Sequence, residues 1–322
     1  MVLDLNAGRT TQVATARIAS TPGAATAPSA AVAASADGRV VLVTIDVPDA
    51  NDSLFVVRPE SGDAKLLLRA EIRGAVVSPD GGHVAIGRND DDPSLTGLWI
   101  GTPDGAIRRL VADNPASNGS PPLPFAFSAD DGVLAFGVGL GDSGRQAVLI
   151  PTSSKEGRID RSAGDAQVVG TDATVVGMAT GGEFRSQREL FLWKSPTMFG
   201  GASGADLYDL TTKRSTVLYR PTVGIQLMTA AWRPNAAQYA VVERPESHVF
   251  EPLTAWLRGQ DGSARRLADA PAVEVWWSRD GARLFAVVGG DDSVGGISDL
   301  LSGKGVMQFC KRGGGPPPAP CT

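Results

Sequence analysis

The sequence predicts an all-β fold made of repeated units, and two observations carry this prediction. Short apolar segments alternate with turns rich in Ser, Asp and Gly, which is typical of strands joined by tight turns. The turns also recur at a regular interval, because their first residues are separated by 43, 50, 52, 53 and 45 positions. A repeat of that length, with about four short strands in each copy, is the sequence signature of a β-propeller.

Three of the six turns share the order Ser, any residue, Asp, Gly, and a fourth has Asp131 in place of the Gly. This order suits a tight turn because Asp bonds to nearby backbone NH groups and Gly adopts positive φ without strain. Two degenerate copies, Thr180–Glu183 and Arg233–Ala236, fill the middle of the chain. The turns begin at Ser35, Ser78, Ser128, Thr180, Arg233 and Ser278, so the sequence predicts six four-stranded blades within 31–309.

The second repeat shows the expected order of strands most clearly. A second turn follows the first and contains a glycine, which stands 25–29 positions after the first turn in five of the repeats. Examples of this glycine are Gly62, Gly105 and Gly157. Four strands, A to D, are predicted around the two turns of the second repeat, at 73–77, 83–87, 98–101 and 107–111.

The two ends of the chain differ from the repeats. Residues 1–13 predict a hairpin that resembles a C–D pair without preceding strands. Two explanations stay open: the hairpin completes the last blade and closes the ring, or it belongs to a truncated seventh blade of a longer protein. The Ala-, Pro- and Ser-rich residues 14–30 are expected to form a linker, and the Gly- and Pro-rich residues 310–322 to be disordered.

Composition excludes several classes of function. The net charge of −5 and the lack of a basic cluster exclude nucleic acid as a partner, because phosphate binding needs clustered Lys and Arg. No apolar run approaches the roughly 18 residues of a membrane span, and the N-terminus shows no signal-peptide pattern. Cys310 and Cys321 lack metal-ligand spacing and could only pair with each other, in an oxidising compartment.

The turn Ser78-Pro79-Asp80-Gly81, with Leu98-Trp99-Ile100 behind it, carries a family resemblance. It resembles the WD40-like (PD40) repeats of TolB-type propellers, and the resemblance extends over about 31–309. It implies a β-propeller and suggests a periplasmic or extracellular location. Similar propellers serve as protein-docking platforms in the cell envelope and as the gating domain of prolyl-oligopeptidase-type peptidases.

Catalytic signatures are weak. No Gly-x-Ser-x-Gly nucleophile elbow occurs, and the two histidines, His83 and His248, are expected in structural or solvent-facing positions. Residues 139–144 fit the pattern G-x-G-x-x-G, but strand-like residues 147–150 follow in place of the helix that dinucleotide binding requires. We therefore expect no enzyme activity and no cofactor.

Acidic residues follow several of the predicted B strands, and B–C loops emerge on one face of a propeller. The rim they would form has three interpretations: solvated turn residues, a Ca²⁺ site, or a docking surface for a partner with a basic surface. No loop has EF-hand spacing, so no metal is predicted. The rim residues are Asp52, Asp90, Asp91, Asp92, Asp142, Asp291 and Asp292.

Large aromatic residues are expected mainly between blades, because sheets that pack face to face bury wide rings. Trp276 and Trp277 are the candidates for a side chain that reaches the central channel. The other rings are expected on C strands (Phe55, Trp99, Phe191, Trp193, Trp256) or on an A strand (Trp232).

The leading functional hypothesis is a non-catalytic docking module, monomeric by itself, that binds a protein or peptide. The alternative is the propeller domain of an extracytoplasmic, prolyl-oligopeptidase-like hydrolase whose catalytic part is absent. A lyase or lactonase with its site on the propeller would need several convergent His and Glu residues, and the sequence holds only 2 histidines.

Overall fold

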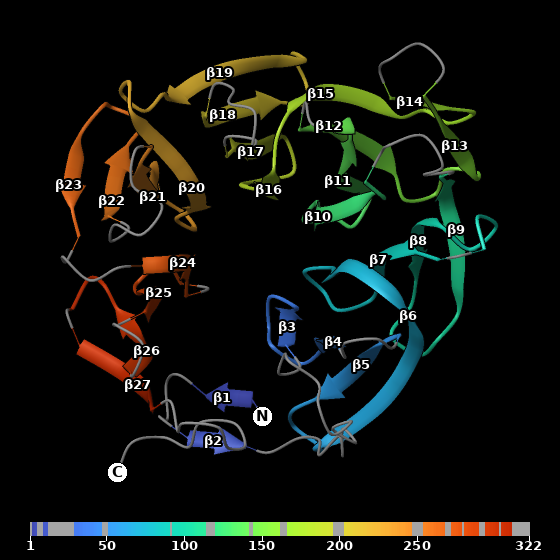
Figure 1. Ribbon diagram of the computed structural model, residues 1–322, viewed down its shortest axis with the longest axis horizontal. Helices are drawn as coiled ribbons and strands as arrows, with labels where there is room; N and C mark the ends of the chain where they lie inside the picture. Colours follow the sequence, from blue (N-terminus) through green and yellow to red (C-terminus); the bar gives the residue numbers. More distant parts are fainter. Residues whose placement is uncertain are drawn as a thin grey trace. The chain divides into compact units, whose positions relative to one another are not determined.

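A computed structural model shows strands as the regular elements of the chain (Figure 1). Two compact units, Met1–Arg188 and Glu189–Thr322, are considered separately below. Among the described residues, no helix is long and apolar enough to cross a membrane. The structure describes residues 2–4, 9–11, 29–46, 51–90, 92–113, 120–141, 144–161, 166–195, 203–246, 254–267, 272–278, 280–289, 294–302 and 304–310.

The first unit begins with a short hairpin of β1 (Val2–Asp4) and β2 (Arg9–Thr11), in which Leu3 lies opposite Thr10. These two strands form a sheet of their own. The next strand, β3 (Ser29–Ala34), takes in the last two residues of the segment expected to be a linker.

The first two repeats share one long strand. Strand β6 (Asp63–Val77) pairs with β5 through its first half and with β7 through its second half, as the long blue ribbon in Figure 1 shows. Their sheet therefore continues from one repeat into the next, in the order β14-β13-β9-β8-β7-β6-β5-β4-β3. Its other strands in these repeats are β4 (Val41–Asp46), β5 (Asp52–Arg58), β7 (Val84–Asn89), β8 (Gly97–Gly101) and β9 (Ile107–Ala112).

The third repeat contains an inserted hairpin that corrects one prediction. Gly157 was expected in the turn before strand D, but it begins β13 (Gly157–Asp160). This strand pairs in parallel with β9 and antiparallel with β14 (Gln167–Val169). The fourth place in the sheet is taken by β15 (Thr174–Met178). The other strands of this sheet are β10 (Leu123–Phe127), β11 (Val133–Gly139) and β12 (Arg145–Pro151), and β15 pairs with β12.

The turn predicted at Thr180–Glu183 is also misplaced. Three of these residues lie in β16 (Gly181–Phe184), and the chain turns at 185–188, where the Arg188 NH donates to Ser186 Oγ at 3.2 Å. Gly181 and Gly182 are buried and have no positive φ, so they serve the close packing of an extended strand rather than a turn.

The second unit contains antiparallel sheets with the predicted strand order. One holds β20 to β23 and another holds β24 to β27, each with neighbours in chain order. Strand β17 (Glu189–Lys194) pairs with β18 (Gly204–Asp209), which pairs with β19 (Arg214–Tyr219). The remaining strands are β20 (Ile225–Trp232), β21 (Gln238–Pro245), β22 (Thr254–Gly259), β23 (Ala264–Arg266), β24 (Ala272–Trp277), β25 (Leu284–Gly289), β26 (Val294–Asp299) and β27 (Lys304–Cys310).

Aromatic rings pack into the core of this second unit. The Phe191 ring lies 5.4 Å from that of Trp232 and 5.6 Å from that of Tyr239, and all three residues are buried. Phe191 and Trp193 were expected on a C strand, but they lie on β17, one strand before the C strand β18. The Gly-rich segment between β17 and β18 hid the order of the strands in the sequence. As a result β17, which is strand B, was assigned as strand C.

Candidate functional site

The Ser-x-Asp-Gly turns repeat one hydrogen-bond pattern. In four turns the Ser hydroxyl donates to the Asp Oδ1 at 2.6–2.7 Å. The same hydroxyl accepts the NH of the residue five positions later at 2.9–3.1 Å, which lies at the start of the next strand or directly before it. Each turn thus uses its Ser and one carboxylate oxygen to hold its own backbone.

The third turn departs from this pattern at one position. Asp131 stands where Gly38, Gly81 and Gly281 stand in the other turns, and it has the same left-handed backbone, with φ of 58°. Its NH donates to the Ser128 carbonyl at 3.0 Å, and its carbonyl accepts the Thr152 hydroxyl at 2.8 Å. The turn therefore holds a second carboxyl group at a fixed place.

That carboxyl group meets His83, which follows the turn of the second repeat. Asp131 is only 8% exposed, and its Oδ2 lies 3.6 Å from His83 Nδ1. Both His83 Nδ1 and Asp131 Oδ1 are buried without a hydrogen-bond partner. Asp80, in the turn before His83, completes a group whose potential ligand atoms all lie within 4.8 Å of one another.

The carboxyl groups of Asp80 and Asp131 lie close together, and like charges at close range disfavour the ionised form of one of them. Burial, reinforced by the neighbouring Asp80, raises the pKa of Asp131 to about 6. A hydrogen bond from Asp131, followed by those from the Ser78 hydroxyl and the Gly82 NH, lowers the pKa of Asp80 to about 2. Asp131 therefore takes up a proton more readily than an ordinary carboxyl group, and a cation would relieve the same repulsion.

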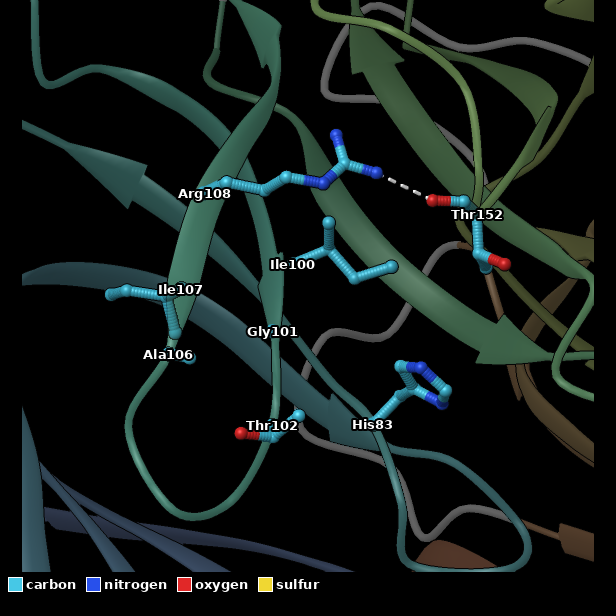
Figure 2. Close-up of a pocket in the computed structure, with 8 residues that line it drawn as sticks. All are labelled: His83, Ile100, Gly101, Thr102, Ala106, Ile107, Arg108 and Thr152. Carbon is cyan, nitrogen blue, oxygen red and sulfur yellow. Dashed lines mark hydrogen bonds between the residues drawn. The ribbon is translucent and has the colours of Figure 1, made fainter.

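A pocket of about 340 Å³ opens beside His83 (Figure 2). Arg108 reaches from β9 across to the end of β12, where its Nη2 donates to the Thr152 carbonyl at 2.6 Å. Ile100 and Ile107 supply apolar surface, so the pocket combines an apolar wall with one cation and several polar groups. Its lining residues are His83, Ile100, Gly101, Thr102, Ala106, Ile107, Arg108 and Thr152.

Three residues of the predicted acidic rim are described, and the carboxylates of all three accept hydrogen bonds from other groups of the chain. Asp52 begins β5 instead of lying in an exposed loop, which corrects that expectation, and its Oδ2 accepts the Ile72 NH at 2.7 Å. Asp90 accepts the Arg88 guanidinium at 2.7 Å, and Asp92 accepts the Ser94 NH at 2.8 Å. Asp91, Asp142, Asp291 and Asp292 lie outside the described residues.

The other sequence candidates have varied outcomes. Trp277 donates from Nε1 to the Ala231 carbonyl at 3.2 Å and lies under the Arg233 guanidinium, so it joins β24 to β20. The Trp276 ring packs 5.9 Å from that of Phe285. His248, Cys321 and the Cys310 side chain lie outside the described part of the structure.

His83 and Asp131 are the residues that sequence reasoning missed. His83 was expected to be structural or solvent-facing, and only its placement beside a carboxyl from another repeat makes it a site residue. A signal was present in the sequence: Asp131 replaces the glycine that this turn position otherwise prefers. A residue that breaks a local rule is often functional.

Neither the protein-family models nor the curated proteins contain a match to this chain. Solved structures do match it, including TolB from Agrobacterium tumefaciens, with a TM-score of 0.50 at 14% identity over 78% of this chain and 86% of that one. The propeller domain of the trilobed protease from Pyrococcus furiosus matches with a TM-score of 0.55 at 10% identity, over 88% of this chain and 84% of that one. The fold is that of a TolB-like β-propeller.

This fold confirms the predicted all-β class and the resemblance to TolB-type repeats, while the number of blades stays a prediction. Oligogalacturonate lyase from Vibrio parahaemolyticus shares the fold too, with a TM-score of 0.57 at 13% identity, over 87% of this chain and 77% of that one. One propeller fold thus occurs in a lyase and in a domain of a protease. Function must be argued from the site, since the fold does not determine it.

Proposed function

We propose that this propeller is a non-catalytic binding module, and that a peptide segment of a partner protein docks in the pocket beside His83. The observation that carries the proposal is the composition of the pocket. Pockets of about 300–1,000 Å³ accept small ligands or a few side chains, and they combine apolar walls with a few placed polar groups. The pocket of about 340 Å³ fits that description.

The charge of the pocket indicates which peptide fits. The Arg108 side chain is exposed and uses Nη2 on the Thr152 carbonyl, which leaves other guanidinium NH groups for a ligand. Arg binds carboxylates well because its fork of donors matches their two oxygens. We therefore propose a peptide with an acidic group for Arg108 and an apolar side chain for Ile100 and Ile107. The basic partner expected from the acidic rim is not part of this proposal.

The experiment is selection of peptides from a random library on the intact chain, followed by affinity measurement on charge variants. Arg108→Glu should weaken the selected peptides about ten-fold or more, since a hydrogen bond to a charged group contributes about 1.5–3 kcal/mol. Arg158→Glu makes the same charge change at an exposed position on β13 outside the pocket, so it should leave the affinity unchanged.

Two results would contradict the proposal. Equal binding by wild type and Arg108→Glu would place the peptide site elsewhere. Cleavage of the selected peptides by the purified chain would contradict the non-catalytic part of the proposal. Mass spectrometry of the peptides after incubation distinguishes simple binding from cleavage.

A further inference from the structure

We propose that Asp80, His83 and Asp131 bind a divalent transition-metal ion such as Zn²⁺. The three residues come from the neighbouring turns of the second and third repeats, and their potential ligand atoms all lie within 4.8 Å of one another. The proposal does not rest on peptide binding. His83 lines the peptide pocket as well, but Arg108, which carries the peptide proposal, is not one of the three proposed ligands.

The spacing of His83 and Asp131 fits two ligands of one ion. Their Nδ1 and Oδ2 atoms are 3.6 Å apart, which is too long for a hydrogen bond of about 2.7–3.2 Å. Two ligand atoms each about 2.1 Å from a zinc ion lie about 3.4–3.6 Å from each other at angles of about 109–120°. The observed distance therefore fits coordination better than a direct hydrogen bond.

Two buried polar atoms at this place lack a partner. Asp131 is more than nine-tenths buried, with 8% of its surface exposed, and its Oδ1 has no hydrogen-bond partner. The Nδ1 atom of His83 is buried and has no hydrogen-bond partner either. Unsatisfied buried groups are uncommon in folded proteins, and a bound ion is one of the few ways to satisfy them. A cation contacted by His83 Nδ1 and by both carboxylate oxygens of Asp131 would satisfy both unpartnered atoms.

Asp80 has a suitable oxygen for the same ion. Its Oδ1 accepts hydrogen bonds from the Ser78 hydroxyl at 2.7 Å and from the Gly82 NH at 2.6 Å. These bonds hold the Asp80 carboxylate in place beside His83 and Asp131. Hydrogen bonds that hold a coordinating carboxylate in place are a usual part of metal sites.

The donor set indicates the class of metal. One imidazole with two carboxylates suits Zn²⁺ and related first-row ions, whereas Ca²⁺ needs six or more oxygens. Three protein ligands would leave a coordination position for solvent. The other described turns lack this set: the residues that match His83 in position are Val40, Val133 and Arg283, and those that match Asp131 are Gly38, Gly81 and Gly281.

The test is calorimetric titration of the EDTA-treated full chain with Zn²⁺, together with the visible spectrum of the Co²⁺ form. Wild type should bind a single ion in this site. Asp131→Gly and His83→Gln should each weaken binding by more than about ten-fold, because even loss of an outer partner costs about 10–100-fold. Asp131→Gly is expected to fold, since glycine occupies this position in three other turns.

Matched controls separate this site from others. Asp130→Asn changes the adjacent carboxylate, which accepts Ser128 Oγ, and His248→Ala removes the other histidine of the chain, so both should keep the wild-type affinity. Arg108→Glu, the variant used for peptide binding, should keep it as well. No binding by wild type, or equal binding by His83→Gln and Asp131→Gly, would overturn the proposal whatever the outcome of the peptide experiments.

Discussion

Arg161 and Asp113 form a two-point ion pair, with Nη2 at 2.9 Å from Oδ2 and Nε at 3.3 Å from Oδ1. Their side chains are 11% and 0% exposed. Asp113 follows β9 and Arg161 follows β13, so the pair fastens the inserted hairpin to the neighbouring strand.

Asp113→Asn should lower the free energy of unfolding of the first unit by about 3–5 kcal/mol, because it leaves a buried guanidinium without its counter-charge. Urea unfolding measures the change. Asp104→Asn is the matched control, since Asp104 pairs with Arg58 at an exposed place, where such pairs contribute about 0–1 kcal/mol. Equal losses in the two variants would show that the buried pair has no special role.

The turn glycines should differ in their tolerance of a side chain. All three of Gly38, Gly81 and Gly281 have positive φ, so alanine costs about 1–2 kcal/mol at each from the backbone alone. A Cβ would meet nothing at Gly38, would lie 3.0 Å from Val40 Cγ2 at Gly81, and 2.7 Å from the Pro234 carbonyl oxygen at Gly281. Thermal denaturation of the alanine variants should rank them in that order, with Gly281→Ala the least stable. The same loss in all three would mean that the neighbours move aside freely.

The turn aspartates should make stability depend on pH. The serine hydroxyl first, and then a backbone NH, holds the pKa of Asp130 and of Asp280 below the ordinary 3.8. A lowered pKa in the folded state stabilises the protein above the ordinary value, and this contribution is lost as the pH falls through the folded-state pKa. Urea midpoints should therefore fall between neutral and strongly acid pH. The double variant Asp130→Asn, Asp280→Asn should show a shallower fall, whereas an unchanged slope would contradict this assignment.

Glu243 is expected to control Tyr219 in the second unit. Glu243 Oε1 accepts the Tyr219 hydroxyl and, at 2.9 Å, Arg258 Nη2. Burial first, and then the bond to Glu243, raises the pKa of Tyr219. Glu243→Gln should lower that pKa towards its ordinary value, as seen by ultraviolet titration, because tyrosinate would no longer face a carboxylate.

The same variant should also destabilise the unit by about 1–3 kcal/mol, since the Arg258 guanidinium loses its charged acceptor. Glu246→Gln, at an exposed position beyond the end of β21, is the control for removal of one negative charge. An unchanged Tyr219 titration in Glu243→Gln would show that burial alone sets the pKa.

The sequence was sufficient to place those turns whose residues encode them locally. The turns at Ser35, Ser78, Ser128 and Ser278 lie where they were predicted, because Ser, Asp and Gly encode the turn within a few residues. The prediction failed at Gly157, where an extra hairpin is inserted. Arg161, directly after the first strand of this hairpin, pairs with Asp113, which lies 48 positions before Arg161. Such a pair has no periodic signature.

The candidate site was hidden for the same reason. His83 and Asp131 belong to different repeats, and only the packing of two turns brings their atoms to 3.6 Å. The acidic rim was predicted where carboxylates already have partners: Asp90 binds Arg88 at the end of β7, and Asp92 binds a backbone NH of its own loop. Charge counted along the sequence does not show which carboxylates already have a partner.

Strand β6 gives the first two repeats a property that repeat proteins usually lack. Stacked repeats commonly behave as modules that can be deleted, exchanged or given new chain ends at their boundaries. Here the boundary falls inside 15 continuous residues, a span of about 50 Å at about 3.3 Å per residue. A circular permutant opened within β6 would break two sets of strand pairings at once. Recombination or engineering that exchanges blades would therefore have to transfer these two repeats together as one unit.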